Sequence, residues 1–186
     1  MTFQPAVFMD RDGVINRAEV RDGVPRPPAS IEDFELLPGV VEAVYRLRHA
    51  GLAVVIVTNQ PDVARGDQRR SVVEAMNERV REALEPDSIV VCYHDDADGC
   101  ECRKPAPGML LAAAEDLALD LTTSFMVGDR WRDIDAGRRA GCRTIFVDHG
   151  YEERRPEAPD AVVADLTEAV TWILTNIVKK QETRIA

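Results

Sequence analysis

The sequence lacks long hydrophobic runs and any excess of positive charge. No apolar stretch approaches about 18 residues, the length that a membrane-spanning helix requires, so we expect no membrane partner. The 33 acidic residues outnumber the 23 basic ones and give a formal net charge of −10. Since proteins bind nucleic-acid backbones through clustered Lys and Arg, we also expect no nucleic-acid partner.

The first residues lack the basic start and the small-residue cleavage site of a secretory signal. We therefore expect a cytoplasmic protein. At 186 residues the chain is long enough for one hydrophobic core and too short for two ordinary domains. We expect a monomer with a single domain over residues 1–186 and without a large cap domain.

Cysteine is scarce, and its distribution is uneven. Three of the four cysteines stand close to one another and to a histidine, at Cys92, His94, Cys100 and Cys102. Because a cytoplasmic chain keeps its thiols reduced, this pattern favours metal binding over disulfides. Three thiolates and one imidazole form a complete tetrahedral set for a structural Zn2+ ion. We expect these four residues to bind zinc and to order a zinc-binding loop over residues 92–102.

Short apolar runs alternate with segments of helical periodicity along the chain. We expect strands at residues 6–9, 52–57, 89–91, 125–127, 144–147 and 161–163. We expect helices at residues 40–48, 71–84, 107–117, 131–140 and 166–178. Strands that are separated regularly by helices imply right-handed crossovers. The predicted fold class is therefore α/β, a doubly wound, Rossmann-like parallel sheet sandwiched by helices.

Two local details accompany this prediction. Ser71 and Glu74 have the spacing of a capping box, which predicts the start of the second helix. Residues 17–34 contain three prolines, at Pro25, Pro27 and Pro28, and are expected to form an irregular loop.

Three of the predicted strands end in reactive side chains. Asp10 and Asp12 follow the first strand, Thr58 and Asn59 follow the second, and Asp129 follows the fourth. In doubly wound sheets, ligands bind beyond the carboxyl ends of the strands. We therefore expect these side chains to converge on one crevice, although the first pair taken alone fits an Asp-rich turn equally well.

Four ordered motifs extend this pattern: Asp10-Arg11-Asp12-Gly13-Val14-Ile15-Asn16, Val57-Thr58-Asn59-Gln60, Cys102-Arg103-Lys104-Pro105 and Val127-Gly128-Asp129. Their order resembles that of the haloacid-dehalogenase phosphatases. The subgroup that the chain resembles, over roughly residues 5–150, contains the D-glycero-D-manno-heptose 1,7-bisphosphate phosphatases and histidinol-phosphate phosphatase. The resemblance implies a phosphoric monoester hydrolase that removes the 7-phosphate of the heptose bisphosphate, with histidinol phosphate or another small sugar or alcohol phosphate as the alternative substrate.

The resemblance also implies the catalytic roles. Asp10 is implied to attack phosphorus and to become an aspartyl phosphate, while Asp12 first protonates the leaving oxygen and then activates water. Thr58 is implied to donate to a phosphate oxygen, and Lys104 to supply positive charge to the phosphoryl group.

Further residues are implied to bind the metal and the substrate. A catalytic Mg2+ ion is expected between Asp10 and Asp129, with the backbone carbonyl of Asp12 completing its oxygen ligands. Substrate binding is implied for three further residues: Asn59, Arg103 and Arg130. Asp133 either supports the metal from outside its ligand shell or is an ordinary acidic residue at the start of a helix.

The chain departs from the family pattern at Pro61-Asp62, where the subgroup commonly has Ser-Gly, and this change removes a hydroxyl and an N–H group. The Pro-rich segment 17–34 also differs from that of the heptose enzymes. Two functions from other classes stay open. A phospho-receiver signalling module needs an acceptor Asp where this chain has Thr58, and a non-catalytic zinc-binding protein has no chemical need for Asp10 and Lys104.

Overall fold

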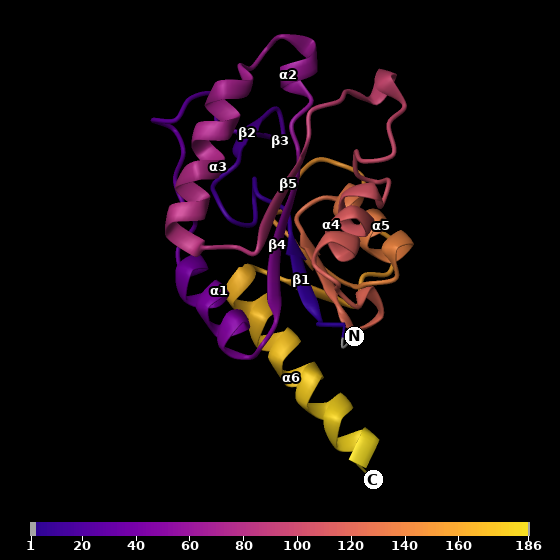
Figure 1. The fold of residues 1–186 in the computed structure, drawn as a ribbon. Helices are drawn as coiled ribbons and strands as arrows, with labels where there is room; N and C mark the ends of the chain where they lie inside the picture. Colours follow the sequence, from indigo (N-terminus) through magenta and orange to yellow (C-terminus); the bar gives the residue numbers. More distant parts are fainter. Residues whose placement is uncertain (1–2, 186) are drawn as a thin grey trace.

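The computed structural model describes the backbone of residues 3–185 and the side chains of residues 3–177. Six parallel strands form one sheet in the order β5-β4-β1-β6-β7-β8 (Figure 1). The bounds of these strands are β1 Ala6–Met9, β4 Ala53–Asn59, β5 Ser88–Cys92, β6 Phe125–Gly128, β7 Arg143–Val147 and β8 Ala161–Val163. The order runs outward from β1 in both directions, which is the doubly wound topology that the alternation of strands and helices predicts.

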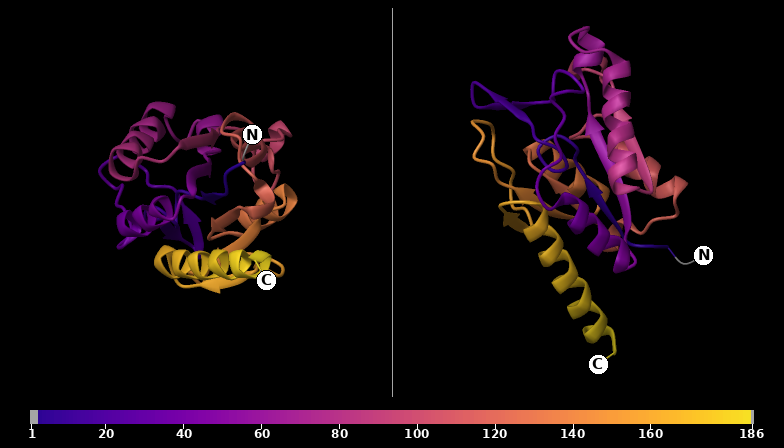
Figure 2. Two further views of the ribbon diagram at one scale, coloured as in Figure 1. Left: turned by 60° about the horizontal axis from the view of Figure 1, so that its bottom comes forward. Right: turned by 90° about the vertical axis from the view of Figure 1, so that its left-hand side faces the viewer.

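Helices cover both faces of the sheet. One face packs against α1 Val40–His49, α3 Arg70–Leu84 and α6 Leu166–Ile185. The other face packs against α4 Gly108–Asp116 and α5 Trp131–Ala140. Successive residues of β1 alternate between the two cores, since Val7 and Met9 contact the first and Phe8 contacts the second. Figure 2 shows the sheet between these two helical layers.

The observed helices differ from the predicted ones mainly at their ends. The capping box predicted for α3 is wrong, because the helix begins at Arg70, and Arg69, at the N-cap position, makes no side-chain cap hydrogen bond. Glu74 is engaged elsewhere, since its carboxylate accepts hydrogen bonds from the Tyr93 hydroxyl at 2.6 Å and from Arg70 at 3.4 Å. The last helix extends to Ile185, beyond the predicted end.

The segment predicted as an irregular loop contains a β-hairpin, so that prediction is wrong. Strands β2 Glu19–Arg21 and β3 Val24–Arg26 pair antiparallel. Asp22 and Gly23 join them with φ values of 51° and 72°, and two positive φ values are typical of the tightest hairpin turns. Pro25 is accommodated because a two-stranded ribbon leaves the outer side of each strand free of ladder hydrogen bonds.

The carboxyl ends of the strands lie at the end of the molecule that is uppermost in Figure 1. The β2–β3 hairpin, the short helix α2 Asp62–Arg65 and the 3-10 turn η1 Asp96–Asp98 gather at the same end. A second 3-10 turn, η2 Leu121–Thr123, precedes β6. Within residues 3–185, every helix is too short or too polar to cross a bilayer.

Candidate active site

Three carboxylates meet beyond the ends of β1 and β6. Asp10 follows β1, Asp129 follows β6, and Asp133 lies in the first turn of α5. One oxygen of each side chain lies within 4.8 Å of an oxygen of the other two, and all three residues are buried. The structure therefore brings together Asp10 and Asp129 as the strand-end pattern predicts, and it adds Asp133 as a third acid.

A buried lysine neutralises part of this charge. The Nζ atom of Lys104 lies 2.8 Å from Asp10 and 2.7 Å from Asp133, and it donates to the Val57 carbonyl at 2.7 Å. Only 1% of the Lys104 surface is exposed. Although burial lowers the pKa of Lys104, the charges of Asp10 and Asp133 raise it above its usual range, so this residue is a permanent cation.

The three carboxylates still outnumber the single positive charge of Lys104, and this excess affects their protonation. Burial, with further contributions from Asp133 and Asp12, raises the pKa of Asp10 to about 6 despite the opposing effect of Lys104. Burial and the charges of Asp10 and Asp133 raise the pKa of Asp129 well above its usual range. Among the described residues, no donor has hydrogen-bond geometry toward either buried Asp129 oxygen, although the Tyr151 hydroxyl lies close enough to lower the pKa of Asp129. Clustered carboxylate oxygens without donors are suited to a hard divalent cation such as Mg2+.

The loop that follows Asp10 passes directly over this cluster. Gly13 has a φ of +92°, and a Cβ atom at this position would lie 1.9 Å from Oδ2 of Asp129. The loop is fixed from the other side by His149, whose Nε2 donates to the Gly13 carbonyl at 2.7 Å. The close approach of the backbone to the acids therefore requires glycine at position 13.

Asp12 occupies a different environment from Asp10. Its carboxylate accepts hydrogen bonds from Arg11 at 3.0 Å, from Asn16 at 3.0 Å and from Gln60 at 2.7 Å. Arg11 is itself fully buried and donates to the Asn77 amide oxygen at 2.8 Å. Donors from three positions thus hold the Asp12 side chain in one orientation, while 13% of it stays exposed at the cleft.

The end of β4 provides two polar residues with different surroundings. Thr58 is buried, and its hydroxyl accepts a hydrogen bond from Gln60 at 2.9 Å. The Asn59 side chain makes two hydrogen bonds with the backbone of Lys104, donating to its carbonyl at 3.0 Å and accepting from its N–H at 3.1 Å. Asn59 therefore fixes the segment that carries the buried lysine.

Asp10, Asp12, Asn59 and Lys104 open onto a cleft with about 420 Å3 of space, which includes its open mouth, whereas Thr58 and Asp129 do not line it. The cleft is lined by Asp10, Asp12, Ala18, Pro25, Arg26, Pro27, Asn59, Lys104, Arg130, Arg132 and Asp133.

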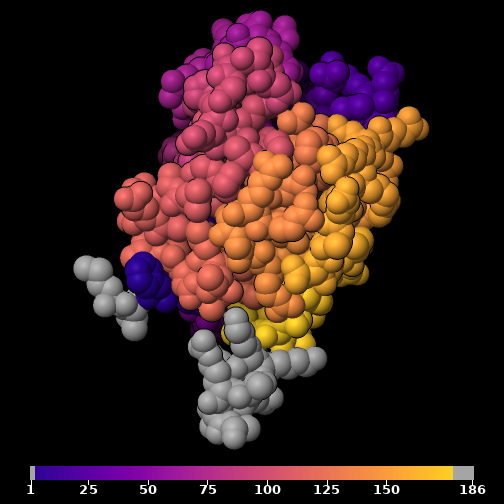
Figure 3. Space-filling view, turned by 90° about the vertical axis from the view of Figure 1, so that its right-hand side faces the viewer, coloured from indigo at the N-terminus to yellow at the C-terminus, as the bar shows by residue number. Residues whose placement is uncertain are grey.

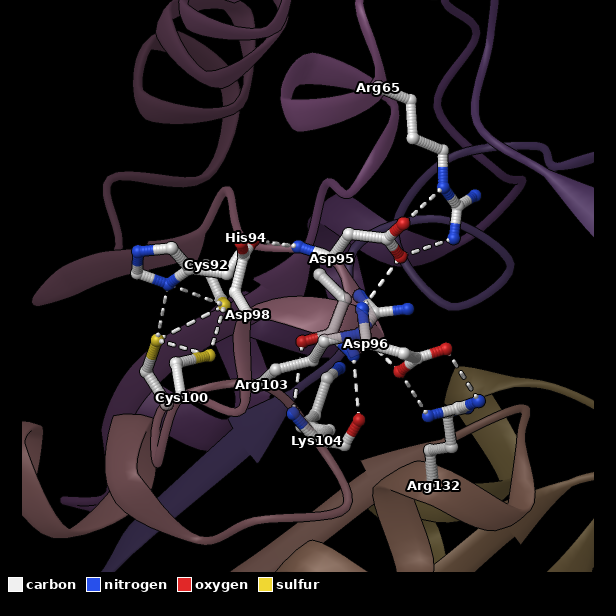
Figure 4. A network of polar contacts seen from close by, with 12 residues as sticks. Arg65, Cys92, His94, Asp95, Asp96, Asp98, Cys100, Arg103, Lys104 and Arg132 are labelled. Atoms are coloured by element: carbon white, nitrogen blue, oxygen red, sulfur yellow. Dashed lines mark hydrogen bonds and ion pairs between the residues drawn. The ribbon is translucent and has the colours of Figure 1, made fainter.

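Of the two arginines predicted to bind substrate, only Arg130 lines the cleft. Arg130 is paired with Glu153, to which Nε donates at 2.9 Å and Nη2 donates a second hydrogen bond. The side chain of Arg103 points to Asp96, which accepts from Nε at 2.7 Å. Figure 4 shows this contact together with Arg132, which also donates to Asp96.

The cysteine-rich loop forms a second cluster at the end of β5, close to Lys104 (Figure 4). Its four possible ligand atoms, from Cys92, His94, Cys100 and Cys102, lie within 4.8 Å of one another. The Sγ–Sγ distances are 3.1, 3.4 and 3.7 Å, and His94 Nδ1 lies 3.2 Å from Cys102 Sγ. Three sulfur atoms and one imidazole nitrogen at these separations fit the donor set of a tetrahedral zinc site.

The segment after β7 reaches the site although it contains no motif that predicts this. His149 contacts the Asp10–Gly13 loop, and the Tyr151 hydroxyl lies beside Asp129. Burial and the charge of Asp129 raise the pKa of Tyr151, so the phenol stays protonated. The rule that strand ends carry the site applies to β7 as well, and it is the one signal in the sequence that points to these residues.

Comparisons with known proteins agree on one kind of enzyme. The family model described as HAD-hydrolase-like matches residues 101–169. D-glycero-D-manno-heptose-1,7-bisphosphate 7-phosphatase of Thermosynechococcus vestitus is 39% identical, over 94% of this chain and 97% of the relative. D-glycero-beta-D-manno-heptose-1,7-bisphosphate 7-phosphatase of Escherichia coli K12 is 35% identical, over 89% of this chain and 93% of the relative.

Solved structures show the same likeness. The D,D-heptose 1,7-bisphosphate phosphatase of B. bronchiseptica, in complex with magnesium and phosphate, superposes with a TM-score of 0.79. It is 33% identical in sequence, and the match covers 93% of this chain and 99% of that protein.

Proposed function

The chain belongs to the haloacid-dehalogenase phosphatases, in the subgroup that contains the heptose 1,7-bisphosphate phosphatases, and it is a phosphoric monoester hydrolase; we propose that it removes the 7-phosphate of D-glycero-D-manno-heptose 1,7-bisphosphate. The names of relatives that align over nearly the whole chain support this substrate. The observation that carries the proposed chemistry is the approach of Lys104 to within 2.8 Å of Asp10, beside Asp129 and Asp133.

We propose that Asp10 is the nucleophile. One of its oxygens forms a bond to phosphorus while the ester bond between phosphorus and the 7-oxygen breaks. Asp12, protonated at this stage, transfers its proton to the leaving oxygen, so the sugar departs as an alcohol. The products of this step are an aspartyl phosphate at position 10 and an ionised Asp12.

In the second step Asp12 accepts a proton from water while the water oxygen attacks phosphorus. The bond between phosphorus and the Asp10 oxygen breaks, phosphate leaves, and Asp12 is protonated again. The donors that hold Asp12, from Arg11, Asn16 and Gln60, support this double role because they fix its carboxylate near the cleft. Lys104 keeps positive charge beside the transferring phosphoryl group in both steps.

Asp10 and Asp129, with the backbone carbonyl of Asp12, are proposed to hold magnesium. When bound there, magnesium supplies the positive charge that offsets the repulsion between these carboxylates and the phosphate of the substrate. Asp133 lies 2.7 Å from Lys104 Nζ, and we propose that it orients the lysine. Thr58 and Asn59 are proposed to act from the end of β4, the former as a donor to phosphate and the latter as a substrate contact.

We propose a structural role for zinc at Cys92, His94, Cys100 and Cys102. The loop between the ligands is polar and contributes little to a hydrophobic core, so a metal ion is a strong source of order for it. Cys102 lies two positions before Lys104 in the chain, and fixing the thiolate therefore restrains the lysine. Reduced thiols in a metal-binding cluster also support the proposed cytoplasmic location.

A phosphate-release screen tests the substrate. It contains both anomers of the heptose 1,7-bisphosphate, histidinol phosphate and common hexose phosphates, each with added magnesium. We expect the highest kcat/KM for one of the heptose anomers. A higher kcat/KM for histidinol phosphate or a hexose phosphate would reject the proposed substrate while leaving the phosphatase chemistry intact.

A further inference from the structure

Three arginines line the cleft, and their charges are not equally available. Arg130 is paired with Glu153, and Arg132 donates to both carboxylate oxygens of Asp96. Arg26 makes no ion pair or side-chain hydrogen bond with any residue whose side chain the structure describes. The side chain is exposed, so its guanidinium, with five N–H donors, is available to a ligand.

The hairpin that carries Arg26 is held at its tip. The Gly23 carbonyl accepts a hydrogen bond from the Glu152 N–H at 2.9 Å, so the turn rests on the segment that follows β7. Figures 2 and 3 show the indigo hairpin against the orange residues of this segment. A Cβ atom at position 23 would lie 2.6 Å from Glu152, which shows how close the two segments are.

The chain is also held after the hairpin. The Gln68 amide donates to the Ala29 carbonyl at 2.9 Å, which ties the end of the Pro-rich segment to the loop before α3. Pro27 follows Arg26 directly, and its ring restricts the backbone of both residues. Because the chain is anchored on both sides of Arg26, at Gly23 and at Ala29, binding a ligand at Arg26 requires little additional ordering of the backbone.

We propose that Arg26 binds the phosphate that is not hydrolysed, the 1-phosphate, and that the β2–β3 hairpin thereby selects bisphosphates over monophosphates. This inference rests on the proposed function. The acids and Lys104 lie together at the strand ends and receive the reacting phosphoryl group, whereas Arg26 enters the same cleft from the hairpin. A planar guanidinium presents paired donors that match the oxygens of a phosphate.

The test compares Arg26→Gln with the wild type on two ligands, the heptose 1,7-bisphosphate and its 7-monophosphate, which share the reacting group. We expect kcat/KM for the bisphosphate to fall about 10- to 100-fold, mainly through KM, because a charge-assisted hydrogen bond is lost. For the monophosphate, kcat/KM of Arg26→Gln should stay within about twofold of the wild-type value. Arg26→Lys should recover part of the loss, since it restores the charge without the fork.

Arg21→Gln is the matched control, because Arg21 lies on the same hairpin, is paired with Glu19 and lies outside the cleft. We expect it to behave as the wild type. Equal losses for both ligands in Arg26→Gln, or no loss for either, would overturn the inference. Calorimetric binding of both ligands to Asp10→Asn, with and without Arg26→Gln, gives the same comparison without turnover. The two proposals can fail separately. If the wild type hydrolyses neither ester but binds the bisphosphate more tightly than the monophosphate, and Arg26→Gln removes this difference, the inference is upheld and the proposed function is rejected.

Discussion

The ammonium group of Lys104 lies 2.8 Å from the carboxylate of Asp10, and both residues are buried. The two positions are 94 residues apart in the chain, and the end of β1 and the loop after the cysteine cluster bring them together. This contact connects the proposed nucleophile to the proposed phosphate-binding lysine. It also makes the stability of the site depend on the balance of its buried charges.

Lys104→Met tests this balance. The substitution leaves Asp10 and Asp133 buried without their shared cation, and breaking a buried pair from one side costs about 3–5 kcal/mol. We expect the free energy of unfolding to fall by this order in magnesium-free urea titrations. A loss below about 1 kcal/mol would show that the lysine is not required to offset these acids.

Gly13→Ala tests the close approach of the loop to Asp129. The added methyl group would lie 1.9 Å from the Asp129 carboxylate, so we expect magnesium affinity and activity to be lost. Gly51→Ala is the control, because Gly51 has a φ of +80° but no atom within 4 Å of its added Cβ. In both variants an alanine in the left-handed conformation destabilises the folded state by about 1–2 kcal/mol. Only Gly13→Ala should lose magnesium binding in isothermal titration calorimetry. Equal magnesium affinities in the two variants would contradict the packing described here.

The proposed zinc site predicts that the purified protein contains zinc and that mutation of a ligand removes it. We expect elemental analysis to find about one zinc per chain, and Cys100→Ser to lose the metal and to lower Tm by several degrees. Cys142→Ala is the control, since Cys142 is buried directly before β7 and does not belong to the group of four possible ligands, so this variant should retain zinc. If wild-type protein that has been purified without chelator contains no zinc, the proposed zinc site is ruled out.

The pKa of Asp10 predicts how stability depends on pH in magnesium-free buffer. The value of about 6 lies above the ordinary 3.8, so between these values the folded state binds more protons than the unfolded chain. The stabilising contribution of Asp10 to the free energy of unfolding is therefore fully present below about pH 4 and is lost as the pH rises through about 6.

Asp10→Asn removes this titration. We expect the variant to match the wild type in stability near pH 4 and to exceed it at pH 7, by an amount on the order of 3 kcal/mol or less. Urea unfolding at a series of pH values measures the difference. A difference that is independent of pH would show that Asp10 does not titrate in this way.

The sequence was sufficient for the parallel sheet and for the convergence of Asp10 and Asp129, because strand ends in a doubly wound fold meet at one edge. Lys104 follows no strand end and came from the resemblance alone. We did not predict the hairpin from the sequence, because a proline such as Pro25 normally disfavours a strand, although it is tolerated in an isolated two-stranded ribbon. The position of Tyr151 beside Asp129 depends on how the segment after β7 folds back, which no local pattern encodes.

The ion pair of Arg103 with Asp96 was equally inaccessible to sequence reasoning. Both side chains belong to polar segments without periodicity, and their pairing depends on the fold of the cysteine-rich loop. Only Nε of Arg103 donates to Asp96, whereas Nη1 is buried without a hydrogen-bond partner among the described residues, so the predicted substrate contact of Arg103 does not require this pair to open. The predicted contact of Arg130 is placed more favourably, since that residue lines the cleft.

The nucleophilic role of Asp10 is tested most directly by magnesium-dependent phosphate release, measured for Asp10→Asn and the wild type on the best substrate of the screen. We expect magnesium to activate the wild type, and we expect the variant, although folded, to lose at least about 1,000-fold in kcat, because no other group in the site replaces the attacking carboxylate. Turnover by the folded variant within about tenfold of the wild type would contradict the assignment of Asp10 as nucleophile.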